Sequence, residues 1–203
     1  VATKGKEGAL VEVNSETDFV ARNELFQKFV LKAATVALEL KGNIEAIQNQ
    51  LSEELTQLIA TIGENMNIRR VEFLSVENGV VASYMHNTIA PNLGTIGVLV
   101  AMEDASGADL ATVGKHIAMH VAASQPVCVD VADVPAEMVE HERSIYAEQV
   151  AQSGKPADIA AKMIEGRINK YYEEIVLLKQ PFVMDPAKKV EAVLAESSKA
   201  AKL

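Results

Sequence analysis

An α+β fold is the class that this sequence predicts. Apolar residues recur at helical spacing in several stretches, short strand-like runs bounded by turn residues lie between them, and two long helical patterns follow near the carboxyl end. We expect two small sheet-plus-helix subdomains, 1–86 and 87–203. An antiparallel coiled-coil helical hairpin at about 134–178 is inserted in the second subdomain.

The first elements are expected to be a strand at 9–13 and a helix that ends at Gly42-Asn43. A short helix at 44–50 should follow, and then a further helix that Ser52 caps and Gly63 ends. The apolar residues that define the first helix are Phe26, Phe29, Val30, Ala33, Ala37 and Leu40.

The middle of the chain reads as strands. Residues 68–76 and 80–86 flank Glu77-Asn78-Gly79, and Asn-Gly between two β-prone runs predicts a hairpin. A loop at 87–94 should follow. Residues 95–102 are apolar almost throughout, which predicts a strand that is covered on both faces.

The remaining pattern is helical. We expect helices over 109–124 and 133–152, a second hairpin helix starting at Pro156, and a final helix starting at Asp185-Pro186. The short turn before Pro156 makes the two hairpin helices antiparallel. Spacings of three, four and seven predict the seam of the coiled coil, formed by Met138, Ile145, Gln152, Ile164, Ile168, Tyr171, Ile175 and Leu178.

Composition restricts the function. The 203-residue chain is 49% hydrophobic and has a net charge of −9, which argues against a nucleic-acid partner because such a protein needs a basic face. Its single cysteine, Cys128, permits no internal disulfide, and we therefore expect a reducing cytoplasmic location. No apolar run approaches the roughly 18–20 residues that span a bilayer, so no membrane association is expected.

A zinc site is one enzymatic alternative. His116 and His120 lie four residues apart on an expected helix, a spacing that can ligate zinc. The metalloprotease pattern requires glutamate directly after the first histidine, where this chain has Ile117. A structural pair of histidines is the preferred interpretation, and we expect no metal.

Two other enzymatic patterns are incomplete. Gly154-Lys155 resembles part of a phosphate-binding loop, but Pro156 replaces the serine or threonine that would hold magnesium. Ser83 and Tyr84 should face opposite sides of a strand, and no acidic residue follows to orient His86. The sequence therefore predicts neither a catalytic constellation nor a small-molecule substrate or cofactor.

The segment Thr17-Asp18-Phe19-Val20 lies between the first strand and the first long helix. In one interpretation Thr17 or Asp18 caps a helix and Phe19 packs beneath it. In the other, Phe19 is an exposed anchor that could contribute roughly 1.5–3 kcal/mol when a partner buries it. Periodicity alone does not decide between them.

Several long stretches resemble the bacterial elongation factor Ts family, whose members exchange guanine nucleotide on elongation factor Tu. These stretches occur in the family's order from about residue 9 to residue 190. They are VNSETDFVARNELFQ, IGENMNIRR, KHIAMHVAASQP, SGKPADIAAKMIEGRINKYYEE and QPFVMDP.

This resemblance implies a function without a chemical step. The partner would be elongation factor Tu carrying GDP, and the chain would accelerate nucleotide release, so it would not be an enzyme. The segment Thr17-Asp18-Phe19-Val20 would insert near the nucleotide and its magnesium ion, with Phe19 as a wedge and Asp18 disturbing the surroundings of the ion. Ile62, Gly63 and His86 correspond to further contacts.

The resemblance has two gaps. Family members usually begin with a small helical domain that nothing here matches, and many continue beyond the QPFVMDP region with another strand. Asn87 follows His86 where the family commonly has glycine. The alternative function is a non-enzymatic scaffold that binds partners through the coiled-coil hairpin.

Overall fold

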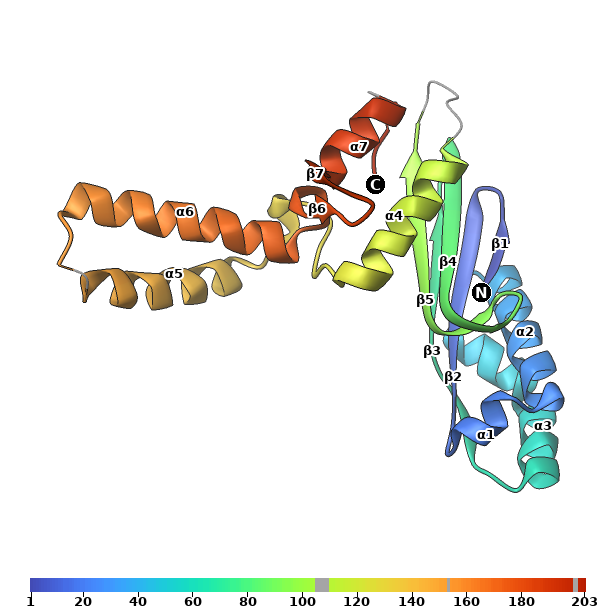
Figure 1. The fold of residues 1–203 in the computed structure, drawn as a ribbon. Coiled ribbons are helices and arrows are strands. Elements are labelled where there is room, and N and C mark those ends of the chain that lie inside the picture. The colour runs from blue at the N-terminus through green and yellow to red at the C-terminus, as the bar shows by residue number, and fades with distance from the viewer. Residues whose placement is uncertain (105–109, 153, 199–200) are drawn as a thin grey trace. The chain divides into compact units, whose positions relative to one another are not determined.

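The computed structural model describes residues 1–104, 110–152, 154–198 and 201–203, and it confirms the α+β class (Figure 1). The chain divides into two compact units. One, here called the core unit, comprises Val1–Ala122 and Ser197–Leu203. The other, the hairpin unit, comprises Ala123–Glu196. Each unit is described by itself.

These units differ from the expected subdomains. The boundary predicted at residue 86 falls inside strand β4 (Gly79–Ala90), which pairs along its length with β5 (Leu93–Glu103). The expected beginning of a helix at residue 109 lies outside the described residues, and that helix is described as α4 (Ala111–Ser124).

Two layers of antiparallel strands form the centre of the core unit. Strand β2 pairs with β1 and β3 in one sheet, and β4 pairs with β5 in a separate hairpin. Helices α2 and α3 cover one face of the three-stranded sheet (Figure 1). The elements before β4 are β1 (Ala2–Lys4), β2 (Glu7–Ser15), α1 (Asp18–Ala21), α2 (Glu24–Glu39), α3 (Ile44–Ile62) and β3 (Met66–Ser75).

The alternation of side chains along β2 explains this layering. Ala9 and Val11 are buried in the cluster formed with α2 and α3. Gly8 points the other way, and a Cβ there would lie 3.2 Å from Leu99 Cδ2 of β5. On the far face of β5, Met102 lies against Gly114 of α4. The prediction that this strand is covered on both faces holds from Gly97 to Met102, whereas Thr95 and Ile96 are exposed.

The predicted hairpin around Glu77-Asn78-Gly79 is wrong. Strand β3 pairs with β2, whereas β4 turns back at Pro91-Asn92 to pair with β5. Asn92 takes a left-handed φ of 64°, which asparagine tolerates in a tight turn. Asn78 instead accepts a hydrogen bond from the Asp104 amide. The expected loop at 87–94 is thus mostly strand and turn.

The two helices expected between residues 44 and 63 form one helix, α3. Asn43 caps it, because its side chain accepts a hydrogen bond of 3.1 Å from the Ala46 amide. Ser52 lies inside the helix, and its hydroxyl donates to the Asn49 carbonyl instead of capping. The predicted end at Gly63 is confirmed, with φ of 83° at that glycine.

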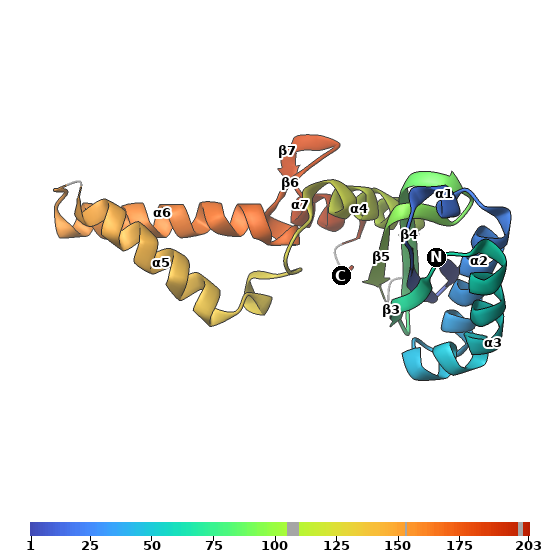
Figure 2. The same cartoon turned by 90° about the horizontal axis from the view of Figure 1, so that it is seen from below.

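Two antiparallel helices, α5 and α6, dominate the hairpin unit (Figure 2). Val150 and Ile168 are their buried residues, and Arg167 lies 5.4 Å from the centre of the Tyr146 ring. Gln152 is exposed, so it does not belong to the seam. The coiled-coil geometry stays a prediction. The elements of this unit are η1 (Val131–Asp133), α5 (Ala136–Ala151), α6 (Ala157–Ile175), η2 (Leu177–Lys179), β6 (Pro181–Phe182), β7 (Asp185–Lys189) and α7 (Val190–Ser197).

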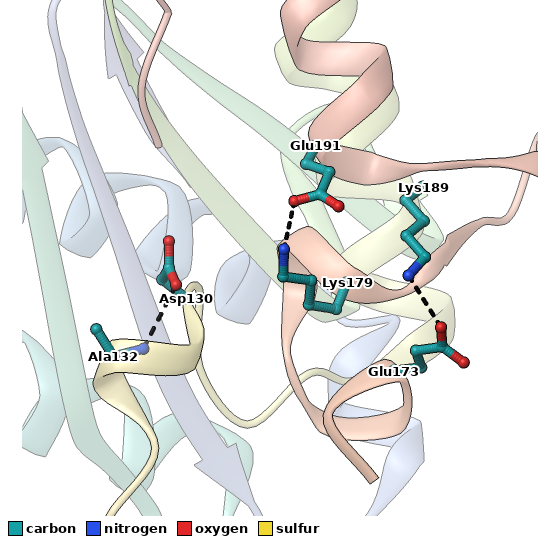
Figure 3. A network of polar contacts seen from close by, with 6 residues as sticks. All are labelled: Asp130, Ala132, Glu173, Lys179, Lys189 and Glu191. Atoms are coloured by element: carbon teal, nitrogen blue, oxygen red, sulfur yellow. Dashed lines mark hydrogen bonds and ion pairs between the residues drawn. The ribbon is translucent and has the colours of Figure 1, made fainter. Parts of the chain in front are cut away.

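Ion pairs join the end of α6 and the following turn to the last elements of this unit (Figure 3). Lys189 lies 2.9 Å from Glu173, and Lys179 lies 2.7 Å from Glu191. The helix expected to start at Asp185-Pro186 starts instead at Val190. Residues 185–189 form β7, because Asp185 pairs with the buried Phe182 across a short turn.

Candidate functional site

The short helix α1 holds two neighbouring apolar side chains in opposite environments. Phe19 is 80% exposed, whereas Val20 is only 4% exposed. Successive residues on a helix point about 100° apart, so a helix that buries Val20 directs its neighbour outward. The interpretation in which Phe19 packs beneath the helix is therefore wrong. Val20 takes that place.

A residue far along the chain holds the start of α1. The Thr17 amide donates to Glu64 Oε2 at 3.0 Å, and the Thr17 hydroxyl donates to Glu64 Oε1 at 2.7 Å. Thr17 stands at the N-cap position of α1, but its side chain makes no capping bond to the helix. The threonine that the sequence offers as a cap instead fastens α1 to the turn between α3 and β3.

The other end of α1 is also fastened. Gln27 of α2 donates a hydrogen bond of 2.9 Å to the Ala21 carbonyl. Asn23 caps α2 by accepting from the Leu25 amide at 2.8 Å. The carboxylate of the exposed Asp18 makes no hydrogen bond or ion pair with the residues that the structure describes. Asp18 and Phe19 are therefore presented to solvent from a helix whose two ends are held.

The structure brings together two of the predicted contact regions. Ile62 ends α3, and Gly63 turns the chain so that Glu64 reaches Thr17. His86 lies elsewhere, exposed on β4, where its Nδ1 is 3.2 Å from the Tyr84 hydroxyl. No hydrogen bond joins His86 to α1 in the described part of the chain.

The residue after His86 shows why the local backbone differs from an ordinary strand. Asn87 has a φ of 50°, in the left-handed region that glycine favours and asparagine tolerates. Asparagine is thus compatible with the conformation that glycine would adopt at this position. The pairing of β4 with β5 also shifts register between Thr88 and Ala90.

A groove of about 600 Å³ lies beside α1. Figure 2 shows α1 and the tip of the β4–β5 hairpin on the same side of the core unit. Ala21 and Phe26 line the groove on the helical side, and Ile89 and Ile96 line it on the hairpin side. The groove therefore presents mainly apolar surface next to the helix that carries Phe19.

Glu12 lines this groove and supplies charge there. It forms ion pairs with Arg70 and, at 3.2 Å, with Arg69. Burial acts to raise the pKa of the Glu12 carboxyl, but hydrogen bonds and the charges of both arginines outweigh it. The pKa of Glu12 is lowered as a result. This carboxylate belongs to an ion-pair network and stays charged near neutral pH.

The two histidines singled out in the sequence lie on α4. His120 is fully buried and His116 is half-buried. Within the described ranges no group of three or more His, Cys, Asp or Glu residues could hold a metal ion. None of the helices described has both the length and the apolar character needed to cross a membrane.

Sequence reasoning missed Glu64 as a site residue. It stands directly after Gly63 in the stretch IGENMNIRR, where an acidic side chain follows a helix end. That position alone would suggest a solvated charge. Its partner is 47 positions away in the sequence, so only the folded chain reveals the contact.

Comparison with known proteins gives one consistent result. A family model described as Elongation factor TS matches residues 16–203. Elongation factor Ts of Rhodospirillum centenum is 52% identical over 95% of this chain and 66% of its own length. Elongation factor Ts of Gluconobacter oxydans is 51% identical over 97% of this chain and 68% of its own length. The chain thus spans about two thirds of the length of these curated relatives.

Proposed function

The chain belongs to the elongation factor Ts family, and from that premise we propose that it is a guanine-nucleotide exchange factor. It would bind elongation factor Tu carrying GDP, promote GDP release and so support translation elongation in the cytoplasm. The observation that carries the proposal is Phe19, an aromatic ring 80% exposed on a short helix whose two ends are fastened. Large apolar side chains held outward in this way are typical anchors of protein interfaces.

The proposed mechanism is negative coupling between two ligands of one GTPase. The exchange factor and the nucleotide each bind elongation factor Tu, but they favour conflicting conformations of the region around the nucleotide. Each therefore weakens the other by the same factor. Phe19 would act as the wedge that favours the nucleotide-poor conformation.

Charge contributes at the same place. A magnesium ion on the GTPase neutralises the phosphates of the nucleotide, so displacing the ion weakens phosphate binding. The Asp18 carboxylate, which is exposed beside Phe19, would bring negative charge into those surroundings. Thr17 and Val20 would hold the segment in place, and Ile62, Gly63 and His86 would make further contacts. No covalent or proton-transfer step is needed.

The direct test is a GDP-release assay. Elongation factor Tu loaded with fluorescent GDP is mixed with this chain and excess unlabelled nucleotide. We expect the release rate to rise with chain concentration and to reach a plateau, as it does when an exchange factor forms a complex that precedes release. A rate equal to that of elongation factor Tu alone, at concentrations where the two proteins bind, would contradict the proposal.

The alternative function is a scaffold that works through the α5–α6 hairpin. Both helices carry mostly exposed residues, which leaves a long surface available to a partner. A variant lacking about residues 140–175, with a short glycine linker in their place, separates the two functions. Exchange through Phe19 predicts a mild loss of GDP release in this variant. A scaffold predicts that binding to the partner disappears.

A further inference from the structure

We propose that Glu64 is a positioning residue that fixes the direction of Phe19. The inference deepens the proposed function and rests on it, since it assigns to Glu64 the preorganisation of the segment that enters the GTPase. Glu64 would not itself need to contact the partner. It would act through Thr17, the residue that begins the segment.

The length of α1 is the first reason. The helix has four residues, and a helix this short has no stability of its own in water. Its direction must come from contacts outside it. Burial of Val20 fixes one side chain, and the hydrogen bond from Gln27 fixes the carbonyl at its end. At its start, Thr17 donates two hydrogen bonds to Glu64, 47 positions away.

The chemistry of the contact is the second reason. The two oxygens of the Glu64 carboxylate accept separately from the amide and the hydroxyl of Thr17, at 3.0 and 2.7 Å. Hydrogen bonds to a charged acceptor are stronger than neutral ones. Glutamine could keep both contacts only if the Thr17 hydroxyl reversed its role and accepted from the amide NH₂, and neither bond would then have a charged acceptor. A carboxylate is therefore the stronger partner for Thr17.

The backbone at Gly63 is the third reason. Gly63 ends α3 with a φ of 83°, and this turn directs the next side chain toward Thr17 instead of along the helix. Ile62 and Gly63 are themselves predicted contacts with the partner. The two bonds of Glu64 thus join that contact region to the Phe19 segment in one preorganised surface.

Preorganisation has a distinct kinetic signature. Without the Glu64 contact, the Phe19 segment would populate the binding-competent direction for only part of the time. The apparent affinity is then the intrinsic affinity multiplied by the fraction of time spent in that direction, while the complex, once formed, keeps the same geometry. Removal of Glu64 should therefore raise the half-saturating concentration in GDP release and leave the plateau rate nearly unchanged. Removal of the Phe19 ring should lower the plateau as well.

The first experiment needs no partner. The chain contains no tryptophan, so Phe19→Trp introduces a single tryptophan at the segment in question, which can be excited selectively over the tyrosines. Time-resolved anisotropy of this probe should show a larger local motion when Glu64→Ala or Thr17→Val is added. Glu39→Ala, at the exposed end of α2, is the matched control and should leave the motion unchanged. Equal local motion in all four proteins would overturn the proposal.

The second experiment is the GDP-release titration, with unfolding temperatures measured on the same samples. We expect Glu64→Ala to raise the half-saturating concentration about tenfold, and Glu64→Gln to give an intermediate value. Thr17→Val added to Glu64→Ala should produce little further change, because both substitutions disrupt the same Thr17–Glu64 contact. If the half-saturating concentration of the Glu64→Ala variant, counted in folded protein, equals that of the unmodified chain, Glu64 has only a structural role and the proposal is refuted.

The two experiments distinguish failure of the proposed exchange function from failure of the positioning role of Glu64. If the unmodified chain does not release GDP, the proposed function fails, and the anisotropy still decides whether Glu64 restrains Phe19. If the chain releases GDP and Glu64→Ala moves neither readout, the exchange function stands and the positioning role is wrong.

Discussion

Replacing Phe19 by alanine separates stability from recognition. The ring is 80% exposed, so its loss should change the free energy of unfolding by less than about 0.5 kcal/mol. Full burial of a phenylalanine is worth roughly 1.5–3 kcal/mol, and four fifths of that is available for a partner to bury, which gives about 1.2–2.4 kcal/mol. The apparent second-order rate constant for GDP release should therefore fall roughly 8- to 60-fold.

The assay is GDP release from elongation factor Tu at chain concentrations well below saturation, with thermal unfolding followed on each variant. Val20→Ala is the matched control, because it alters the next residue, which is only 4% exposed. It should lower the unfolding free energy by on the order of 1–2 kcal/mol, since it removes buried methyl groups. Phe19→Leu keeps an apolar side chain and should lose less exchange activity than Phe19→Ala.

The reasoning fails if Phe19→Ala unfolds the chain while exchange per folded molecule is retained. That result would mean that the ring stabilises its own domain in solution. It also fails if Val20→Ala and Phe19→Ala reduce exchange equally with no difference in stability, because the opposite environments of the two side chains would then have no consequence.

Three further predictions concern single residues of the core unit. The pKa of Glu12 is lowered below its ordinary 4.5 because the hydrogen bonds and charges of Arg70 and Arg69 together outweigh the effect of burial. Its contribution to stability is therefore present above that value and lost as pH falls through the folded pKa. Denaturant unfolding of Glu12→Gln and the unmodified chain should therefore differ near neutral pH and converge in acid. Gly63→Ala meets no atom within 4 Å but must adopt a φ of 83°, and its unfolding free energy should fall by about 1 kcal/mol. Gly8→Ala would place Cβ 2.6 Å from Val81 Cγ1, and overpacking between the two strand layers should lower the unfolding temperature at a cost of about 1–3 kcal/mol.

The sequence predicted best the features that local chemistry determines. The apolar spacing that ends at Leu40 predicted α2, and Gly63 marked the end of α3. Strand pairing was predicted less well. Asn78-Gly79 has the composition of a tight hairpin turn, yet β3 pairs with β2, where it shares the core formed with α2 and α3. Burial of a whole strand face outweighs the preference of two turn residues.

The direction of Phe19 is beyond prediction from its neighbours for a physical reason. Apolar periodicity requires several turns to define a buried face, and α1 has only four residues. Either Phe19 or Val20 could have faced inward on composition alone. The choice depends on which of them the body of the core unit accepts and on Glu64, which lies 47 positions from Thr17. If Phe19 is the proposed wedge, its orientation depends on the distant residues that hold so short a helix, and changes at Glu64 should affect recognition as directly as changes within the segment.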